Sequence, residues 1–159
     1  MKFTPSKLNT FTFFKLPSVW WCGIRVTKIE NSFCEVKVVH RWINQNPFKS
    51  MFWAVQGMAA ELTTGVLIMQ AIKNSNRKIS MLVLNNRANF SKKAKGKILF
   101  ECNENQILSK AMNQLLETQV PQTIWLTSKG VDQNGDIVST FEFGWTLLCL
   151  LYTSPSPRD

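Results

Sequence analysis

Apolar and polar residues alternate along six segments of the chain, and a period of two is typical of β-strands with one buried face. The segments form three pairs: 24–30 with 32–42, 79–90 with 96–102, and 123–132 with 136–145. A turn separates the members of each pair, at Asn31, in the basic run SKKAKG and at Asn134-Gly135. Asn-Gly is a strong hairpin signal. The pattern therefore predicts pairs of antiparallel strands.

Apolar residues three and four apart indicate helices in three other stretches of the chain. These stretches are 5–15, 46–72 and 104–118. Asn46 followed by Pro47 is a good N-cap and first-turn pair for the long central helix, and Ser50 offers a second cap. The run KNSNRK closes this helix. Pro17 ends the first helix, and the chain then leads to a turn at Gly23.

The order of elements is helix, two strands, long helix, two strands, short helix, two strands. Paired strands around one central helix predict an α+β fold with an antiparallel sheet. No internal repeat or Gly/Ser-rich linker divides the chain, so we expect a single domain over 1–147 with a helical lead-in at 1–21. Residues 148–159 include CLLYTSPSPRD, which resembles translated sequencing adapter. We predict that this tail is non-native or disordered.

The bulk composition narrows the class of protein and of partner. The chain is 45% hydrophobic and 18% charged, which is typical of a globular protein. Its 19 basic and 10 acidic residues give a net charge of +9, which favours polyanionic partners such as nucleic acid, an anionic membrane surface or a phosphate-rich ligand. A basic protein without any such partner is the alternative.

The four cysteines point away from metal and disulfide chemistry. They form no CxxC pair and show no metal-type spacing with the single histidine, His40. Zinc, haem and disulfide scaffolds are therefore not expected. The first 18 residues lack the apolar core of a secretory signal, which predicts a cytoplasmic protein with reduced thiols.

Glu61 is the only acid in the apolar stretch 46–72, NPFKSMFWAVQGMAAELTTGVLIMQAI. A lone buried carboxylate is unfavourable by several kcal/mol unless it is neutral or paired. A membrane-spanning helix is disfavoured because polar residues such as Gln56 interrupt the run. Two interpretations stay open: a structural carboxylate paired to an Arg or hydrogen-bonded, or a functional one in a pocket, where shifted pKa values are concentrated.

The segment NPFKSMFWAVQGMAAE resembles the helix region of the hotdog-fold acyl-CoA thioesterases, especially the phenylacetate-pathway type and its thioesterase-like relatives of unassigned function. Asn46 stands at the family's Asn, Ser50 at its Thr, and Glu61 at its catalytic acid, with the family's separation of fifteen residues from Asn to acid. VLNNRANFSKKAKGKI also resembles the family's strand, basic turn and Gly-led strand, and the likeness covers roughly 16–146. It implies a hotdog fold, in which a curved antiparallel sheet wraps one long helix.

The resemblance also implies a thioester hydrolase that works as a homodimer or a dimer of dimers, with acyl-CoA bound at the subunit interface. Glu61 would act as general base or nucleophile. The backbone N–H of Trp53 would polarise the thioester carbonyl, and Asn46 would orient water or substrate. The other residues expected to contact substrate are Ser50, Phe52, Gln56 and Gly57. No metal or cofactor is implied, because coenzyme A enters only as part of the substrate.

Three departures from the family's pattern lie beside this predicted site. Lys49 replaces a Gly, Phe52 replaces a His, and Trp53-Ala54 replace a Gly-Gly pair. Bulky side chains at glycine positions narrow the approach of a thioester. The alternative function is therefore a non-catalytic hotdog dimer that binds acyl groups or lipid, with Glu61 in a structural role.

The basic turn after 79–90 supplies further candidates. Lys92, Lys93 and Lys95 would attract the phosphates of coenzyme A at a pocket rim. A solvated turn that protects strand ends is the alternative. Nucleic acid is not expected as a partner, because single-strand binding prefers aromatic residues among the lysines and only Phe90 is near. No stable membrane span is expected, although residues 1–21 offer a weaker hypothesis of a membrane-surface anchor.

Overall fold

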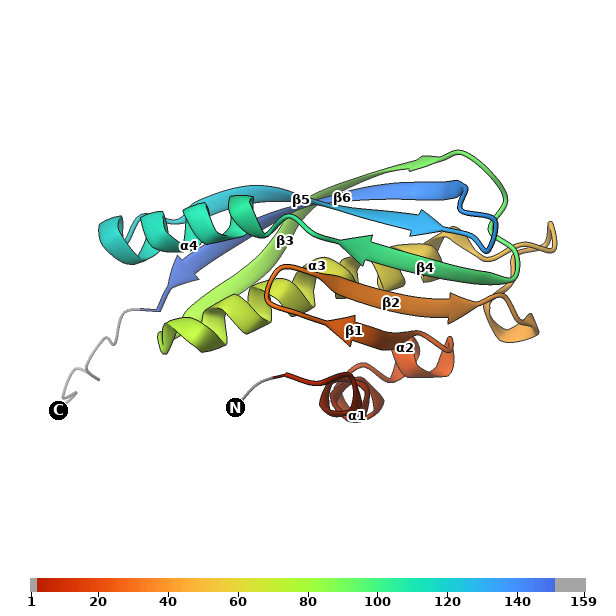
Figure 1. The fold of residues 1–159 in the computed structure, drawn as a ribbon, viewed down its shortest axis with the longest axis horizontal. Coiled ribbons are helices and arrows are strands. Elements are labelled where there is room, and N and C mark those ends of the chain that lie inside the picture. Colours follow the sequence, from red (N-terminus) through yellow and green to blue (C-terminus); the bar gives the residue numbers. More distant parts are fainter. Residues whose placement is uncertain (1–2, 151–159) are drawn as a thin grey trace, which may run out of the picture.

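A computed structural model describes residues 3–150 and shows an α+β architecture. One six-stranded antiparallel sheet, in the order β1-β2-β4-β5-β6-β3, curves around the long helix α3 (Figure 1). The strands are β1 (Arg25–Ile29), β2 (Cys34–Val39), β3 (Ile79–Phe90), β4 (Lys97–Cys102), β5 (Gln122–Val131) and β6 (Ile137–Cys149). The helices are α1 (Pro5–Lys15), α2 (Pro17–Trp21), the 3-10 turn η1 (Trp42–Asn44), α3 (Trp53–Ser75) and α4 (Asn105–Thr118). The predicted fold class is confirmed.

The hairpin of β5 and β6 forms where the Asn134-Gly135 signal predicted it. Gly135 has φ +85°, a backbone conformation that glycine adopts without strain. The Asp132 carboxylate accepts hydrogen bonds from the backbone N–H groups of Asn134, at 2.9 Å, and Asp136, at 3.0 Å. Local side-chain chemistry therefore fixes this turn and, with it, the register of β5 against β6.

The end of the sheet lies further along the chain than predicted. β6 continues through Leu148 and Cys149, which pair with Ser80 and Ile79 of β3. These two residues therefore belong to the fold and not to the predicted tail. Residues 151–159 of that tail prediction, Tyr152 included, lie outside the described residues, as do residues 1–2 of the lead-in.

Two other boundaries differ because side chains reroute the backbone. β2 ends at Val39 and not at 42, since the Asn44 side-chain amide donates to the Val39 carbonyl at 2.9 Å and turns the chain into η1. The segment after Pro17, predicted as a lead into a turn, forms the short helix α2. Its five residues are too few to show helical periodicity in the sequence.

The long helix begins at Trp53 and not at Asn46, so Asn46 and Ser50 are not its N-caps. Phe52 occupies the N-cap position without a side-chain hydrogen bond. Lys49 has φ +57°, a left-handed conformation that cannot continue into a right-handed helix. Residues 46–52 therefore form a loop that precedes α3.

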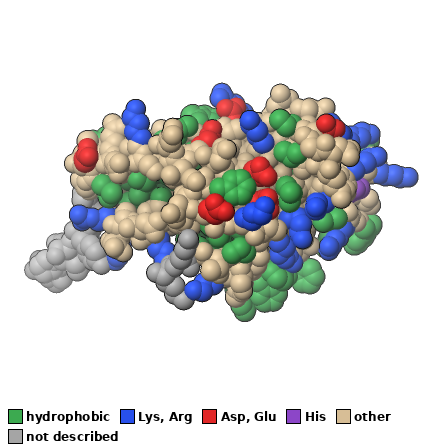
Figure 2. Space-filling view, in the orientation of Figure 1, with side chains coloured by type: hydrophobic (Ala, Val, Ile, Leu, Met, Phe, Trp, Pro, Cys, Tyr) green, Lys and Arg blue, Asp and Glu red, His purple; other side chains and the backbone are tan. Residues whose placement is uncertain are grey.

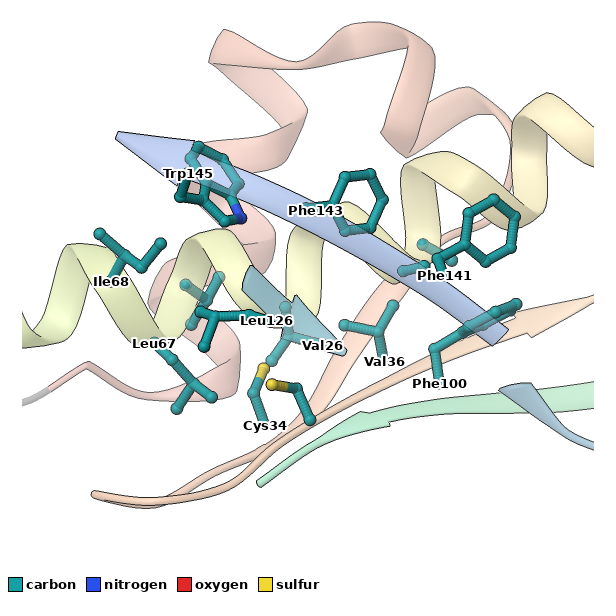
Figure 3. Close-up of a cluster of buried hydrophobic side chains, with 14 of the residues drawn as sticks. Val26, Cys34, Val36, Leu67, Ile68, Phe100, Leu126, Phe141, Phe143 and Trp145 are labelled. Carbon is teal, nitrogen blue, oxygen red and sulfur yellow. The ribbon is translucent and has the colours of Figure 1, made fainter. Parts of the chain in front are cut away.

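The core lies between α3 and the concave face of the sheet. Along β6, Phe141, Phe143 and Trp145 are two residues apart, so their side chains share one face, and Figure 3 shows them in line next to α3. On α3, Ala59 and Ile68 are fully buried. This packing fixes which side of α3 meets the sheet and leaves another strip of the helix free.

The two edges of the sheet are treated differently. At the β1 edge, the Asn9 side chain of α1 donates to the Val26 carbonyl and accepts from the Val26 N–H, both at 2.9 Å, so α1 covers the edge. At the other edge, β3 exposes Leu82 (58%) and Leu84 (51%). Long, apolar edge strands are templates for pairing with another chain.

Candidate functional site

Glu61 lies near the middle of α3, on the strip that the sheet leaves free. The helix alternates between buried residues that face the sheet and partly exposed ones such as Met58 and Leu62. Glu61 is itself exposed, so the premise that it is a buried acid is wrong. An apolar pattern on two faces of a helix does not reveal which face the sheet covers.

Beside Glu61 is an apolar cavity of about 170 Å³. α1 and the start of α2 form one wall, α3 forms another, and β3 and β6 close it. Its walls include Phe11, Leu62, Met69, Met81 and Trp145. Glu61 is the only ionisable side chain among the residues that line it.

The other polar groups in the cavity wall already have partners. The Thr12 hydroxyl donates to the Asn9 carbonyl at 2.9 Å, and the Trp145 indole N–H donates to the Thr64 hydroxyl at 3.0 Å. A ligand in the cavity therefore meets an apolar surface with a single reactive polar group at its mouth, the Glu61 carboxylate.

Within the described residues 3–150, the Glu61 carboxylate forms no hydrogen bond or ion pair. The structural interpretation, in which an Arg or a hydrogen bond compensates the acid, thus finds no partner among the described residues. Partial desolvation by the surrounding protein raises the pKa of Glu61 above its ordinary value. A raised pKa makes the carboxylate a stronger base than a fully hydrated one.

A second, wider hollow of about 410 Å³ lies at the N-terminal end of α3. Six of the sequence-predicted site residues line it: Asn46, Ser50, Trp53, Gln56, Lys92 and Lys93. The 46–52 loop, the first turns of α3 and the β3–β4 turn meet at this point. These six residues therefore lie together, but at a different place from Glu61.

The polar side chains of this second hollow are engaged in holding its walls. The Asn46 side-chain oxygen accepts from the backbone N–H groups of Phe48, at 2.9 Å, and Ser50, at 3.2 Å. The Gln56 amide donates to the Met51 carbonyl at 3.3 Å, and its oxygen accepts from the Ser139 hydroxyl at 2.8 Å. These contacts keep the loop and the helix start in a fixed arrangement.

Trp53 is the first residue of α3, where backbone N–H groups have no acceptor within the helix. Its side chain is half exposed and contacts the Phe52 ring edge-on, with centroids 6.0 Å apart. Phe52 lines neither hollow. Gly57 also lines neither hollow, because it lies under Phe141, whose ring would be 3.4 Å from an added Cβ.

The two parts of the predicted site are far apart within one chain. Trp53 and Glu61 are eight residues apart on α3, which corresponds to about 12 Å along the helix axis. One thioester carbonyl cannot reach both the Trp53 N–H and the Glu61 carboxylate of the same chain. A single site that uses both groups needs a second copy of the protein.

The basic turn divides into paired and unpaired lysines. Lys92 forms ion pairs of 2.6 Å with Asp132 and Asp136, which raise its pKa. Lys93 and Lys95 are exposed and have no acidic partner among the described residues. Figure 2 shows Lys and Arg side chains gathered toward the end of the molecule at which this turn lies in Figure 1.

Sequence reasoning missed the walls of the apolar cavity. Phe11, Met81 and Trp145 come from three segments that are far apart in the chain, and only tertiary packing brings them to Glu61. Within residues 3–150, no three side chains of His, Cys, Asp or Glu form a potential metal site. In the same part of the chain, no helix combines the length and the apolarity needed to cross a bilayer.

A curved antiparallel sheet wrapped around one long helix defines a hotdog-type fold. The chain belongs to the family described as Domain of unknown function (DUF4442), whose model matches residues 5–147. No functionally curated protein matches the chain. Family membership and fold agree with the resemblance identified from the sequence.

Three solved structures show the same fold. A Pseudomonas aeruginosa protein of unknown function, described as a probable thioesterase, has a TM-score of 0.79 and 19% identity, over 92% of this chain and 97% of that chain. A Haemophilus influenzae thioesterase has a TM-score of 0.73 and 13% identity, over 96% of both chains. A Chlorobaculum tepidum protein of unknown function has a TM-score of 0.78 and 13% identity, over 92% of this chain and 94% of that chain. The predicted hotdog fold is confirmed.

Proposed function

We propose that this protein hydrolyses acyl-CoA thioesters, with Glu61 as general base or nucleophile. One observation carries the proposal: an unpaired carboxylate with a raised pKa lies at the mouth of an apolar cavity on the central helix. Its structural neighbours include proteins described as thioesterases. An apolar cavity ending in a base suits a substrate with an acyl chain and an electrophilic carbonyl at one end.

In the general-base route, ionised Glu61 takes a proton from water as the water oxygen attacks the thioester carbonyl. The carbonyl oxygen becomes an oxyanion, which a backbone N–H at a helix start can stabilise. Collapse of the tetrahedral intermediate breaks the C–S bond, and the proton held by Glu61 passes to the departing sulfur. In the nucleophile route, the carboxylate attacks the thioester carbonyl, the C–S bond breaks and coenzyme A leaves as the thiolate, which leaves an anhydride between the acyl group and Glu61. Water then hydrolyses the anhydride, which releases the free acid and restores the carboxylate.

The oxyanion donor comes from a partner subunit in this proposal, because Trp53 and Glu61 of one chain are about 12 Å apart along α3. A homodimer formed through the open β3 edge buries Leu82 and Leu84, which are exposed in the isolated chain. Two-fold symmetry then makes two equal sites. Each would combine Glu61 of one subunit with Asn46 and the Trp53 N–H of the partner subunit.

The unpaired lysines and the free thiols fit the same proposal. Lys93 and Lys95 lie beside the hollow at the start of α3, where coenzyme A phosphates would meet exposed cations. All four cysteines are free, although Cys34 and Cys102 are directly opposite each other on β2 and β4. The proposal places the protein in the cytoplasm, where cysteines stay reduced.

The decisive experiment measures thiol release from a panel of acyl-CoA substrates by the wild-type protein and by Glu61→Gln. Loss of a general base typically lowers kcat by about 10²–10⁴-fold, and we expect a loss in this range. Glu117→Gln, a carboxamide change on the exposed side of α4, is the control and should keep full activity. Turnover that survives Glu61→Gln, or its absence from the whole panel with wild type, would overturn the proposal.

A non-catalytic acyl-binding dimer is the second candidate. Phe52 and Trp53 are half-exposed rings at the helix start, where they narrow the path of a thioester to the backbone N–H. This function predicts that acyl-CoA raises the Tm of the wild-type protein without any thiol release, and that Glu61→Gln shows the same rise. The two candidates are thus separated by the same panel.

A further inference from the structure

The apolar cavity beside Glu61 runs along α3 and has a limited volume, about 170 Å³. Along α3 its wall continues from Glu61 to Met69, eight residues or about 12 Å further toward the C-terminus. No charged side chain other than Glu61 lines it, and its Thr12 and Trp145 polar atoms are bonded within the protein. A flexible apolar chain is therefore the class of ligand that fits, with its polar end at Glu61.

We propose that this cavity is the acyl-chain site, that the chain enters beneath α1, and that the cavity limits the acyl group to about six to eight carbons. The inference rests on the proposed function and adds a substrate class to it. An apolar cavity of about 150 Å³ holds a six-carbon ring. The cavity beside Glu61, at about 170 Å³, accepts six or seven carbons, with the thioester carbonyl outside at the carboxylate.

The length of the cavity agrees with its volume. An extended chain advances by about 1.2 Å per bond, so seven bonds span about 8 Å. That length fits within the part of the wall between Glu61 and Met69. Met58, Met69 and Met81 contribute flexible thioether side chains, which adapt to chains of slightly different shape.

α1 acts as a fixed roof that sets this limit. Phe11 reaches into the cavity wall from α1. The paired hydrogen bonds between Asn9 and Val26 hold α1 on the β1 edge. Arg25 adds a cation–π contact with Trp20 of α2 at 3.4 Å, so the following helix is held as well. Because α1 is held in place, it limits the length of the acyl chain and does not move to admit a longer one.

The test uses S-alkyl-CoA thioethers, from ethyl to dodecyl, which bind but cannot be hydrolysed. We expect the affinity of wild type to rise about fourfold per added methylene and to level off near eight carbons. The kcat/KM of the matching acyl-CoA series should peak at the same length. An affinity independent of chain length, or one that still rises at dodecyl, would overturn the inference.

A matched pair of variants locates the chain under α1. Phe11→Ala removes part of the roof and should move the plateau to longer chains. Phe14→Ala makes the same change on the exposed side of α1, where Phe14 is 71% exposed, and should leave the plateau unchanged. Equal profiles for the two variants would overturn the placement.

Leu62→Trp fills the cavity and should move the plateau to about four carbons, because an indole takes up much of the space. Circular dichroism checks that each variant is folded, and the wild-type series decides the chain-length question without any variant. The outcome is separable from that of the proposed function. Thioether binding with a plateau but no turnover contradicts hydrolysis alone, whereas turnover with no length preference contradicts the acyl site alone.

Discussion

The middle of α3, around Glu61, and the start of α3, around Asn46, differ in how their polar side chains are hydrogen-bonded. Around Glu61 the protein presents an apolar hollow, and the one carboxylate there has no partner among the described residues. Around Asn46 the hollow is wider and its main polar side chains, such as Ser50 and Gln56, are hydrogen-bonded to their own walls. The middle of α3 therefore carries a carboxylate without a hydrogen-bond partner within residues 3–150. The start of α3 carries a hydrogen-bonded loop without a free carboxylate.

In the proposed mechanism, this difference means that one chain does not hold a complete site. A base is useful only near an oxyanion donor, and the free backbone N–H groups lie at the helix start about 12 Å away. The middle of α3 supplies the base, and the start of α3 supplies the oxyanion donor. A two-fold axis that sets the two α3 helices antiparallel would bring the start of each helix to the middle of the other, twice in the dimer.

Mixed dimers give the largest expected effect. Glu61→Gln and Asn46→Ala should each be nearly inactive as homodimers, because each removes one half of both sites. When the two chains are co-expressed at equal levels, half of the dimers are mixed, and each has one intact site. The mixture should therefore recover about a quarter of wild-type kcat. The measurement is thiol release from the preferred acyl-CoA.

A control separates complementation from simple addition. The two variants are purified apart and mixed under conditions in which subunits do not exchange. Their summed activity should stay at the level of the homodimers. Two results would show that Glu61 of one subunit and Asn46 of the other do not act together. One is activity that recovers without subunit exchange, and the other is activity that does not recover after co-expression of two folded chains.

Lys93 and Lys95 test the role of the hollow at the start of α3. Changing Lys93 and Lys95 to Glu should raise the KM for acyl-CoA by about tenfold at low ionic strength, because two repulsive contacts replace two attractive ones, and salt should reduce the difference. Lys92→Ala is the contrast: its ion pairs with Asp132 and Asp136 hold the turn, so it should affect stability more than KM. KM is measured by steady-state kinetics.

A shortened substrate checks the cause of that change. An acyl thioester of N-acetylcysteamine has no phosphates, so its KM should be the same for the Lys93/Lys95 double variant and for wild type. If the double variant changes both substrates equally, the lysines act on the fold of the site and not on the phosphates.

Most of the fold follows from local pattern, and the exceptions have a common cause. Alternation located all six strands, and Asn134-Gly135 located a hairpin. The start of α3 was misplaced because Asn46 and Ser50 suit either a helix N-cap or a hydrogen-bonded loop, and the same side-chain acceptors serve both. The left-handed backbone of Lys49 makes this segment a loop and not a helix, and a lysine in the sequence does not predict that conformation.

The candidate site was predictable only in part for a related reason. An acid in an apolar run identifies Glu61 from its chemistry alone. Its exposure depends on which side of α3 the sheet covers, and its cavity depends on α1 and on Met81 and Trp145. Such contacts join residues that are distant in the sequence, and no local pattern encodes them.

Substitution of Lys49 tests how the loop 46–52 before α3 contributes to stability. Its φ of +57° is unfavourable for a residue with a Cβ, and the resembling family has glycine at this position. Lys49→Gly should raise the unfolding free energy by about 0.5–1 kcal/mol, because the strain relieved exceeds the added chain entropy of glycine. Lys49→Ala keeps the Cβ and should not stabilise. Urea unfolding measures both, and equal values for the two variants would contradict the strain.

We expect the smallest effect in the pH dependence of stability, which should differ between the Glu61 and Glu142 carboxylates. The pKa of Glu61 is raised by desolvation, so the folded state binds its proton more tightly than the unfolded state does. Ionisation then costs stability as the pH rises through the raised pKa. Glu61→Gln should therefore have a slightly higher Tm than wild type at pH 8, and the difference should vanish below the ordinary glutamate pKa.

Glu142 should show the opposite sign. Arg87 donates to its carboxylate at 2.6 and 3.0 Å and lowers its pKa, so the pair stabilises the fold above the ordinary glutamate pKa and is lost as the pH falls through the lowered one. Glu142→Gln should lose about 0.2–1 kcal/mol at pH 8, as exposed ion pairs do, and nothing at low pH. Thermal unfolding between pH 3 and 8 gives both curves. If Glu61→Gln is also less stable at pH 8, Glu61 has a stabilising partner, and the contrast between the unpaired Glu61 and the hydrogen-bonded start of α3 fails.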